Sequence, residues 1–319
     1  MLGAGAVYTF ELDRRVSGAE RALRRSAVAV ASAYTFNAQF FLSVEPSVYW
    51  DAEAWHARGQ VSGRLFPNIF YPIGNDTREE LGEGYTEFGL AVAGALTRRL
   101  AGSLRSGAQA GVFRSELTQT QAGGELDRHR VTGSDGALLA GFGPLLVWDD
   151  RDNDFATRRG GRYVLSAAYF GKAWGSDFNV AKYEIDARQF FGLRGEHVIG
   201  AELYAVANFG TVPFQTMAAL GGSNRMRGYF EGRFRDLHML AVQVEYRLPL
   251  FWRFGAAVFG GAGDVAHEID DFGFGDPKLA GGAGIRYSLN RADRVNVRFD
   301  AAGTSTGDLN FYVAFGEAF

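Results

Sequence analysis

The stretch from Arg294 to Ala301 reads RVNVRFDA and alternates polar and apolar side chains without a break. Successive side chains of a β-strand point to opposite faces, so this stretch predicts a strand with one apolar and one charged face. The segments 181–188 and 242–248 show the same alternation. Two folds produce it. In a soluble sandwich the apolar face meets a second sheet, whereas in a membrane barrel it meets lipid and the charged face lines a wet lumen.

The number of such segments favours the barrel. About fifteen candidate strands, each of roughly ten residues, lie near 3–12, 26–35, 38–48, 56–66, 84–97, 99–113, 136–149, 162–173, 178–191, 197–209, 237–249, 252–266, 278–289, 294–303 and 309–319. Bacterial single-chain barrels have an even number of strands. The count is therefore off by one, or a first strand lies upstream of Met1. We predict an all-β protein, a single antiparallel transmembrane β-barrel domain over residues 1–319.

The connections between these strands alternate in length. Outer-membrane barrels place short turns in the periplasm and long loops outside. A strand that ends at Phe319 puts the C-terminus on the periplasmic side, and the long connection at 210–236 then lies outside. The connection at 150–161 falls in the periplasm and is longer than the rule expects. The other short connections are 193–196, 249–252 and 290–293, and the other long ones are 67–83, 114–135 and 267–277.

Composition excludes several classes of function. The chain has 319 residues, no Cys and a formal net charge of -3, so nothing indicates nucleic-acid binding. The five histidines share no metal-ligand spacing, and we predict no metal and no cofactor. No apolar run is long enough for a transmembrane helix. The residues after Met1 lack the pattern of a signal peptide, so a secreted form would be mature or truncated.

A long loop with a strong character lies between two of the strands. Residues Leu220 to Asp236 read LGGSNRMRGYFEGRFRD, with four arginines against two acids and four interspersed glycines. The stretch does not alternate, so we do not expect a strand, and its glycines make it a poor helix. Its aromatics argue against disorder. We therefore predict an ordered functional loop.

This loop resembles the sixth extracellular loop of the BamA/TamA superfamily of outer-membrane barrels, also called the bacterial surface-antigen family. The family's Arg-Gly-Tyr or Arg-Gly-Phe triplet is matched by Arg227, Gly228 and Tyr229, within a seventeen-residue context that also matches. The resemblance implies sixteen strands and a loop folded back into the barrel lumen. The family's POTRA domains, which receive substrates, have no counterpart in this sequence. The resemblance therefore implies a truncated member or a member without them.

Arg227 needs an acidic partner if it points into a lumen, because an unpaired buried cation is costly. The family pairs this arginine with carboxylates on the strands just after the loop, and Glu245 in VQVEYRLP matches one of them. Gly261 occupies the place of the second acid. Asp264 and Asp300 are nearby candidates for a second partner. A two-carboxylate clamp is not predicted, and one salt bridge is.

A second resemblance lies in VWDDRDNDFATRRGGRY, residues 147–163. The family has an Asp-x-Arg-Asp-Asn element followed by a Thr-Arg-Gly-like element. We predict a structural periplasmic turn, whose Asp and Asn side chains cap their own backbone. The alternative is a calcium site formed by the four aspartates, but their spacing is not that of a regular calcium loop. The residues that match are Asp149, Arg151, Asp152, Asn153 and Gly160.

The C-terminal segment LNFYVAFGEAF, residues 309–319, also alternates. Phe311, Phe315 and Phe319 share the apolar face, and Glu317 would interrupt that face near the membrane interface. A terminal Phe that closes an alternating strand resembles the signal by which outer-membrane barrels are recognised for assembly. The alternative is an ordinary last strand.

One catalytic motif matches formally. Residues 303–307 read GTSTG, which fits G-x-S-x-G. A nucleophile elbow joins a strand to a helix. This stretch joins two strands and has no evident His partner, so we predict no enzyme.

The family resemblance implies insertion or translocation of proteins at the bacterial outer membrane. Its mechanism uses a weakly closed seam, here between the strands at 3–12 and 309–319, where an incoming strand could pair. The partners implied are outer-membrane lipids and unfolded outer-membrane proteins or other assembly factors. The alternative function is a passive outer-membrane channel or transport pore, which the charged lumen would suit.

Overall fold

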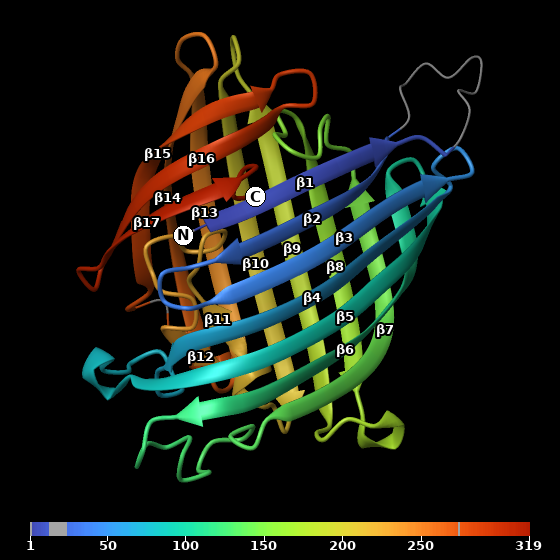
Figure 1. The fold of residues 1–319 in the computed structure, drawn as a ribbon. Coiled ribbons are helices and arrows are strands. Elements are labelled where there is room, and N and C mark those ends of the chain that lie inside the picture. Colours follow the sequence, from blue (N-terminus) through green and yellow to red (C-terminus); the bar gives the residue numbers. More distant parts are fainter. Residues whose placement is uncertain (1, 13–23, 274) are drawn as a thin grey trace.

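The computed structural model describes residues 2–12, 24–273 and 275–319. Within these ranges the chain forms one antiparallel fifteen-stranded sheet that curls into a barrel, and a separate two-stranded ribbon (Figure 1). The ribbon consists of β11 (Ala218–Leu220) and β12 (Phe234–Asp236). The strands of the sheet, in order, are β1 (Leu2–Phe10), β2 (Ser26–Tyr34), β3 (Phe40–Trp50), β4 (Trp55–Phe70), β5 (Glu83–Ala101), β6 (Leu104–Thr120), β7 (Ala137–Asp149), β8 (Gly160–Phe170), β9 (Val180–Gly192), β10 (Val198–Gly210), β13 (His238–Pro249), β14 (Phe254–Ala266), β15 (Lys278–Asn290), β16 (Val295–Thr304) and β17 (Leu309–Phe315).

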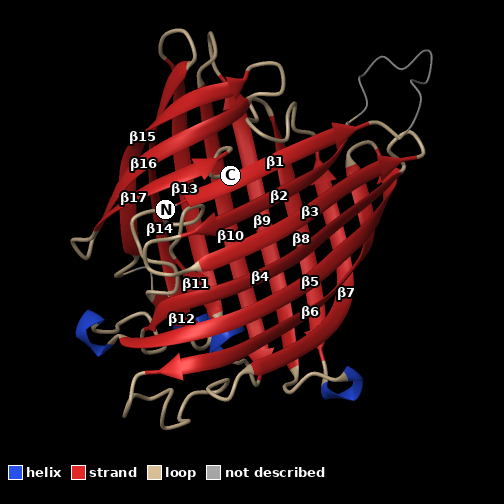
Figure 2. Cartoon of the chain, viewed as in Figure 1, coloured by secondary structure: helices blue, strands red, loops and turns tan. Residues whose placement is uncertain are grey.

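All fifteen strands predicted from the alternation are present, so the all-β prediction is confirmed. The helical content of the described residues is limited to 3-10 turns (Figure 2), at Glu79–Leu81, Lys172–Trp174, Phe214–Thr216 and Ile269–Asp271. No helix among the described residues is long and apolar enough to cross a bilayer.

The two faces of the sheet show which of the two folds this chain adopts. On β16, Phe299 on the outer face is 50% exposed, whereas Arg298 and Asp300 on the inner face are 1% and 3% exposed. On β13 the apolar Val244 is exposed and the charged Glu245 is buried. A soluble protein buries apolar residues and almost never fully buries unpaired charge. This inverted arrangement is that of a transmembrane barrel with a polar lumen.

The sheet order starts at β1 and ends at β17, with every step between them antiparallel. The described sheet thus has fifteen strands, one fewer than the resemblance implies. An odd number of antiparallel strands makes the first and last run in the same direction, as their arrows do in Figure 1. We call the region where the two edges face each other the seam.

The connections place the two ends of the barrel. Because consecutive strands are antiparallel, every second connection lies at the same end, and five short turns share one end, at 51–54, 102–103, 193–197, 250–253 and 291–294. Two further short turns, at 35–39 and 305–308, lie at the opposite end. The long loops lie at the other end, at 71–82, 121–136, 211–237 and 267–277. The β7–β8 connection, residues 150–159, is a longer segment at the short-turn end, as predicted. The short-turn end corresponds to the periplasmic side of outer-membrane barrels.

Outward-facing aromatic residues gather near both ends of the strands. Phe254 and Tyr287 pack together near the short-turn end, with ring centroids 5.3 Å apart, and Trp252 beside them is 67% exposed. Near the loop end, Trp174 lies 5.1 Å from Phe142. Such rings favour the level of the lipid headgroups.

Candidate functional site: the loop in the lumen and its anchors

The connection between β10 and β13, residues 211–237, folds back inside the curve of the sheet (Figure 1). Its two sides pair as β11 and β12, with Leu220 opposite Phe234. The sequence predicted no strand here, and this was wrong at the two ends of the stretch, because three residues are too few for alternation to be recognised. Gly221 has a φ of 113°, and a Cβ there would lie 2.3 Å from the Phe230 carbonyl oxygen. This tight turn therefore requires glycine.

Arg227 lies at the inner tip of this loop, with its side chain fully buried. Its Nη2 lies 2.6 Å from Oε2 of Glu245 on β13, and its Nη1 lies 2.8 Å from Oδ2 of Asp300 on β16. The guanidinium also lies over the Phe259 ring, 3.4 Å from the centroid. The expected salt bridge between Arg227 and Glu245 is present, but the expectation of only one carboxylate was wrong. Asp300, one of the two candidates, supplies a second carboxylate.

Asp264, the other candidate, does not reach Arg227 in the structure. Gly261, at the place where the family has an acid, leaves room for the loop, since a Cβ there would lie 3.0 Å from the Met226 sulfur. Met226 itself donates its N–H to Gln243 Oε1 at 2.8 Å. The second carboxylate thus comes from β16, and the β14 wall at Gly261 is free to receive the loop.

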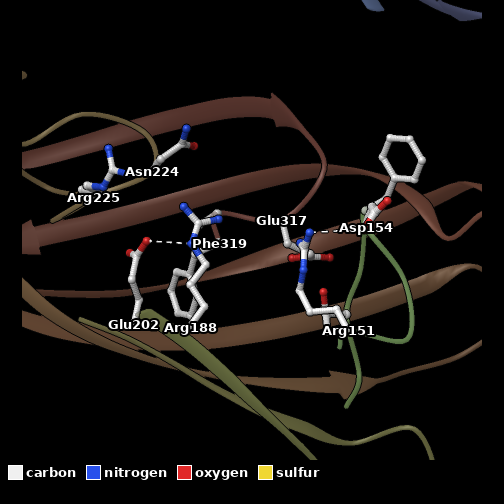
Figure 3. Close-up of a pocket in the computed structure, with 11 residues that line it drawn as sticks. Arg151, Asp154, Arg188, Glu202, Asn224, Arg225, Glu317 and Phe319 are labelled. Carbon is white, nitrogen blue, oxygen red and sulfur yellow. Dashed lines mark hydrogen bonds and ion pairs between the residues drawn. The ribbon is translucent and has the colours of Figure 1, made fainter. Parts of the chain in front are cut away.

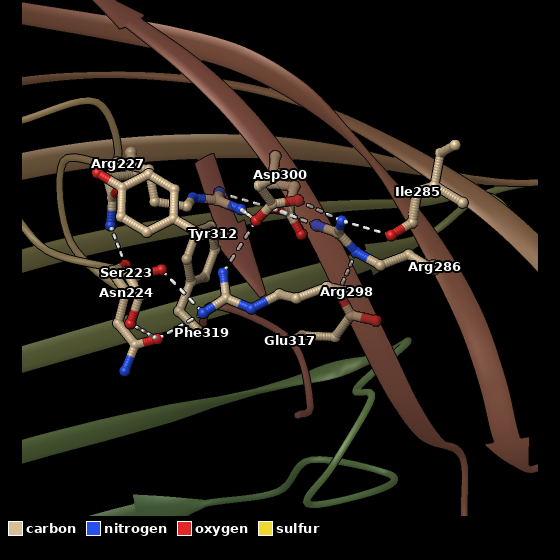
Figure 4. A network of polar contacts seen from close by, with 12 residues as sticks. Ser223, Asn224, Arg227, Ile285, Arg286, Arg298, Asp300, Tyr312, Glu317 and Phe319 are labelled. Carbon is tan, nitrogen blue, oxygen red and sulfur yellow. Dashed lines mark hydrogen bonds and ion pairs between the residues drawn. The ribbon is translucent and has the colours of Figure 1, made fainter. Parts of the chain in front are cut away.

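Arg227 belongs to a larger buried network of charges (Figure 4). Its carboxylates are Glu245, Asp300 and Glu317, and its cations are Arg227, Arg247, Arg286 and Arg298. Arg247 binds Glu245 at 2.7 Å, and Arg286 binds Glu317 at 2.9 Å and also contacts Asp300. Each carboxylate is shared by at least two guanidinium groups. Sharing of this kind offsets the cost of burying charge away from water.

The backbone of Gly228 is held by the last strand. The Gly228 N–H donates to the Tyr312 hydroxyl oxygen at 3.0 Å, and Asn310 Nδ2 donates to the Gly228 carbonyl oxygen at 2.7 Å. Gly228 has a φ of 121°, and a Cβ there would lie 2.9 Å from the Gly303 carbonyl oxygen. Any larger residue would therefore push the loop away from β16 and β17. Sequence reasoning missed Asn310 and Tyr312, although both occupy polar-face positions of an alternating strand.

Tyr229, the third residue of the triplet, is completely buried. Its hydroxyl donates to the Leu279 carbonyl oxygen at 3.1 Å and lies 2.9 Å from Ser305 Oγ. Its ring meets Phe234 edge to face, with centroids 5.5 Å apart. Ser305, the serine of the G-x-S-x-G match, thus serves to hold the loop.

The outer part of the loop is tethered to the β4–β5 loop. Arg233 Nη2 donates to the Thr77 carbonyl oxygen at 2.7 Å, and its Nη1 donates to the Thr77 hydroxyl at 2.8 Å. The Gly74 N–H donates to the Arg235 carbonyl oxygen at 2.8 Å. Sequence reasoning assigned no role to these two arginines, because their partners lie about half a chain away.

The β7–β8 turn caps its own backbone, as its sequence predicts. Asp152 Oδ1 accepts the Arg158 N–H at 2.8 Å, and Asp152 Oδ2 pairs with Arg294 at 2.6 Å. Partial burial acts to raise the pKa of Asp152, but the hydrogen bonds from Arg294 and the backbone outweigh it and lower that pKa. Asn153 Oδ1 accepts two backbone N–H groups at 2.9 Å. Gly160 has a φ of 91° where the turn closes.

The acidic side chains of this turn are engaged by arginines. Asp149 lies between Arg151 and Arg24, each within 2.9 Å of its carboxylate, and Asp154 lies 3.2 Å from Arg151. Among the described residues there is no group of three or more His, Cys, Asp or Glu that could hold a metal ion. The turn is therefore built from ion pairs and backbone caps.

The C-terminal residues depart from the predicted face. Phe311 and Phe315 are 75% and 68% exposed on the outer surface, but Phe319 is 6% exposed and packs on Phe190 inside the barrel. The placement of Phe319 on the outer face was wrong. Gly316, with a φ of 77°, ends β17 and turns the tail inward.

Glu317 follows the same inward turn. The sequence placed it on the apolar face at the membrane interface, and this was wrong as well. Its side chain is 4% exposed and binds Arg286, while Asn296 Nδ2 donates to its other oxygen at 2.8 Å. Arg247 Nη2 also donates to the Phe319 carbonyl oxygen at 2.8 Å. The tail is therefore part of the lumen network.

A polar cavity of about 220 Å³ lies between the loop tip, the β7–β8 turn and the inward tail (Figure 3). Its walls carry both signs of charge, including Arg188, which lies 3.2 Å from Glu202. Arg225 of the loop stacks over the Tyr204 ring at 3.3 Å. The lumen is thus partly filled by protein and partly open.

Comparisons with known proteins agree with this architecture. The family model described as the Omp85 superfamily domain matches residues 21–319. Among solved structures, the chain is similar to BamA from Haemophilus ducreyi lacking POTRA domains 1–3, with a TM-score of 0.61 and 12% sequence identity. That match covers 98% of this chain and 70% of the other, and at this identity it shows the fold alone. No curated protein sequence matches. The family expected from the loop triplet is confirmed, and the chain belongs to the Omp85 superfamily.

Proposed function

We propose that this barrel inserts or translocates proteins at the bacterial outer membrane, and that polypeptide strands engage it at the seam. The observation that carries the proposal is that β1 and β17 are the first and last strands of the described ladder and meet at the seam. Residues 3–9 of β1 are exposed on both faces. An edge strand with free backbone groups is a template for another strand.

The direction of the two edges fits one incoming strand. Because β1 and β17 run the same way, a strand that enters the seam in the opposite direction would be antiparallel to both. Antiparallel ladders are slightly more stable per residue than parallel ones. Gly3 and Gly5 on β1 weaken its own pairing. An unfolded outer-membrane protein, made of such strands, is the partner that this geometry favours, and lipids surround the outer face.

The loop in the lumen is bound to one edge of the seam, β17, and not to the described residues of the other edge, β1. Its tip holds β17 through Asn310 and Tyr312. No hydrogen bond or ion pair joins the loop to the described residues of β1. Opening of the seam would therefore move the β1 side, while β17 stays with the loop. The roles of Arg227, Gly228, Tyr229 and Glu245 as loop anchors are part of this proposal, as is that of Phe311 and Phe315 as an assembly signal.

The test is to lock the seam. Tyr8 and Phe315 lie at the short-turn ends of β1 and β17 and are 70% and 68% exposed. Cysteines at these positions, in a chain without native Cys, can be bridged by a bismaleimide.

We expect the bridged protein to lose insertion of an unfolded barrel protein into liposomes. The control is a cysteine pair at Phe299 and Val313, which already face each other across β16 and β17. That pair should leave insertion unchanged. Full insertion by the bridged seam would overturn the proposal.

The polar cavity favours a second candidate, a passive channel for small solutes. This function predicts ion conductance that the seam bridge leaves unchanged. It also predicts a rise in conductance when residues 221–233 are replaced by a short glycine linker, because the loop fills part of the lumen. Conductance of this kind, with no insertion by the unbridged protein, would establish the channel instead.

A further inference from the structure

The β7–β8 turn, residues 150–159, contacts both ends of the sheet order at the short-turn end. β7 and β8 lie in the middle of that order. Arg24 lies two residues before β2, the second strand. Arg294 lies in the turn between β15 and β16, and β16 is next to the last strand. We call this turn, with Asp149 that precedes it, the strap. Figure 1 shows the turns of this end along the top and the upper right of the barrel.

The contact with the β2 side is a largely buried bidentate ion pair between Arg24 and Asp149. Arg24 Nη1 lies 2.9 Å from Asp149 Oδ2, and Arg24 Nη2 lies 3.1 Å from Asp149 Oδ1. The two side chains are only 16% and 10% exposed. A bidentate arginine–carboxylate pair is both stronger and more directional than a single contact. At this burial it is also less screened than a surface pair.

The contact with the β16 side uses the next residues of the strap. Arg294 Nη1 lies 2.6 Å from Asp152 Oδ2, and Asn153 Nδ2 donates to the Asp293 carbonyl oxygen at 3.3 Å. The other oxygen of Asp152 is fixed by backbone N–H groups of the strap itself. The carboxylate is therefore held in place before it meets Arg294.

Hydrogen bonds within the strap make it rigid, so a displacement at one of its two contacts is transmitted to the other. Thr157 Oγ1 donates to the Asn153 carbonyl oxygen at 2.8 Å, and the Gly161 N–H donates to Asp150 Oδ1 at 2.6 Å. Arg247 of β13 reaches the Thr157 carbonyl oxygen at 3.4 Å. A loop closed by such caps moves as a unit.

We propose that the strap is a latch on the seam, which fixes the distance between the β1–β2 side and the β15–β16 side at the periplasmic end. Release at Arg24 would let the β1–β2 hairpin swing away, while the β16 side stays on the loop network. The latch sets the width of the seam in the resting barrel. It goes beyond the proposed function because it does not depend on which substrate passes through the opening.

The experiment measures that width directly, with no substrate present. Spin labels attached at Tyr8→Cys and Phe315→Cys report the distance between β1 and β17 by pulsed electron paramagnetic resonance. The sample is the full chain in lipid nanodiscs. Arg24→Gln and Arg294→Gln each remove one end of the strap. The matched control is Arg158→Gln, which removes the 2.9 Å pair between the same turn and Glu196 of the β9–β10 turn.

The expected result is a shift to longer distances for Arg24→Gln and for Arg294→Gln, and none for Arg158→Gln. A strap fails when either end is released, so the double variant Arg24→Gln/Arg294→Gln should shift no further than the larger single shift. Arg24→Lys keeps the charge without the bidentate contact, and should give a smaller shift than Arg24→Gln.

Two outcomes would overturn the latch. One is an unchanged distance in an Arg24→Gln variant that is folded, as judged by its heat-dependent mobility in gel electrophoresis. The other is a double variant whose shift is the sum of the single shifts, which would mean two independent local contacts. A failure of protein insertion in the bridged-seam assay is a separate readout, since the latch is measured on the resting barrel.

Discussion

Arg227 is held where neither water nor lipid could solvate it, by the carboxylates of Glu245 and Asp300. The network around it has four guanidinium groups and three carboxylates, so removing an acid leaves more unpaired charge than removing an arginine. We expect Asp300→Asn to lower the free energy of unfolding by about 3–5 kcal/mol, the range for breaking a buried pair. Arg227→Met should cost clearly less. Urea-induced unfolding in detergent micelles measures both.

The two variants should differ in a second respect. Arg227→Met frees the loop tip, so proteases should cut within 221–233 in an otherwise folded barrel. If Arg227→Met destabilises the barrel as much as Asp300→Asn, the excess of positive charge does not decide the energetics of the network.

Gly228 offers a test of the close approach between the loop and the wall. Gly228→Ala adds a Cβ that would meet Gly303 and Thr304 at 2.9 Å, on a backbone with positive φ. Strain of this kind costs on the order of 1–3 kcal/mol. Gly84→Ala is the control, because its Cβ would meet nothing within 4 Å. Equal melting temperatures for the two variants would contradict the fit described above.

Single residues were predictable from the sequence only where their surroundings were local. The triplet and Glu245 were identified by their motifs. Asp300 was one of two candidates, because the choice depends on how the loop lies against the tilted strands. Phe319 was misplaced because the alternation continues through Gly316, and the positive φ there is not visible in the pattern.

At the scale of elements, the strap has a pH dependence whose sign follows from Asp152. The folded-state pKa of Asp152 is lowered, mainly by Arg294 once the effect of burial is overcome. Its contribution to stability is therefore complete above the unfolded pKa of about 3.9 and is lost as the pH falls through the lower folded value. We expect Arg294→Gln to move the carbon-13 titration of the Asp152 carboxyl to higher pH. An unmoved titration would show that the backbone caps alone set this pKa.

The strands were the most predictable elements, since a period of two over ten residues leaves little ambiguity. Prediction ended at the short ribbon of β11 and β12. The sequence also did not predict the contacts of the β7–β8 turn with Arg24 and Arg294, which are more than 120 residues away. Such contacts are set by the closing of the barrel, which no local pattern encodes.

At the scale of the whole molecule, the outer belt should tolerate charge far less than the loops do. Phe299→Arg would place a cation in the middle of β16 on the lipid face, at a cost of about 2–4 kcal/mol. Leu81→Arg, at an exposed position of the β4–β5 loop, should cost almost nothing. Unfolding of both variants from lipid vesicles measures the difference. Equal costs would argue against a bilayer around β16.

The position of the loop's partners along the chain has a consequence for the order of events during folding. The tip contacts Gln243, Asp300 and Tyr312, which all follow it in sequence, at separations of 17 to 84 residues. Its outer arginine reaches back 156 residues to Thr77. Shorter closures form faster. We expect pulse-labelled hydrogen exchange to show that the backbone amides of the C-terminal third are protected first. The loop would already lie inside this folding nucleus, and the N-terminal strands would be added last.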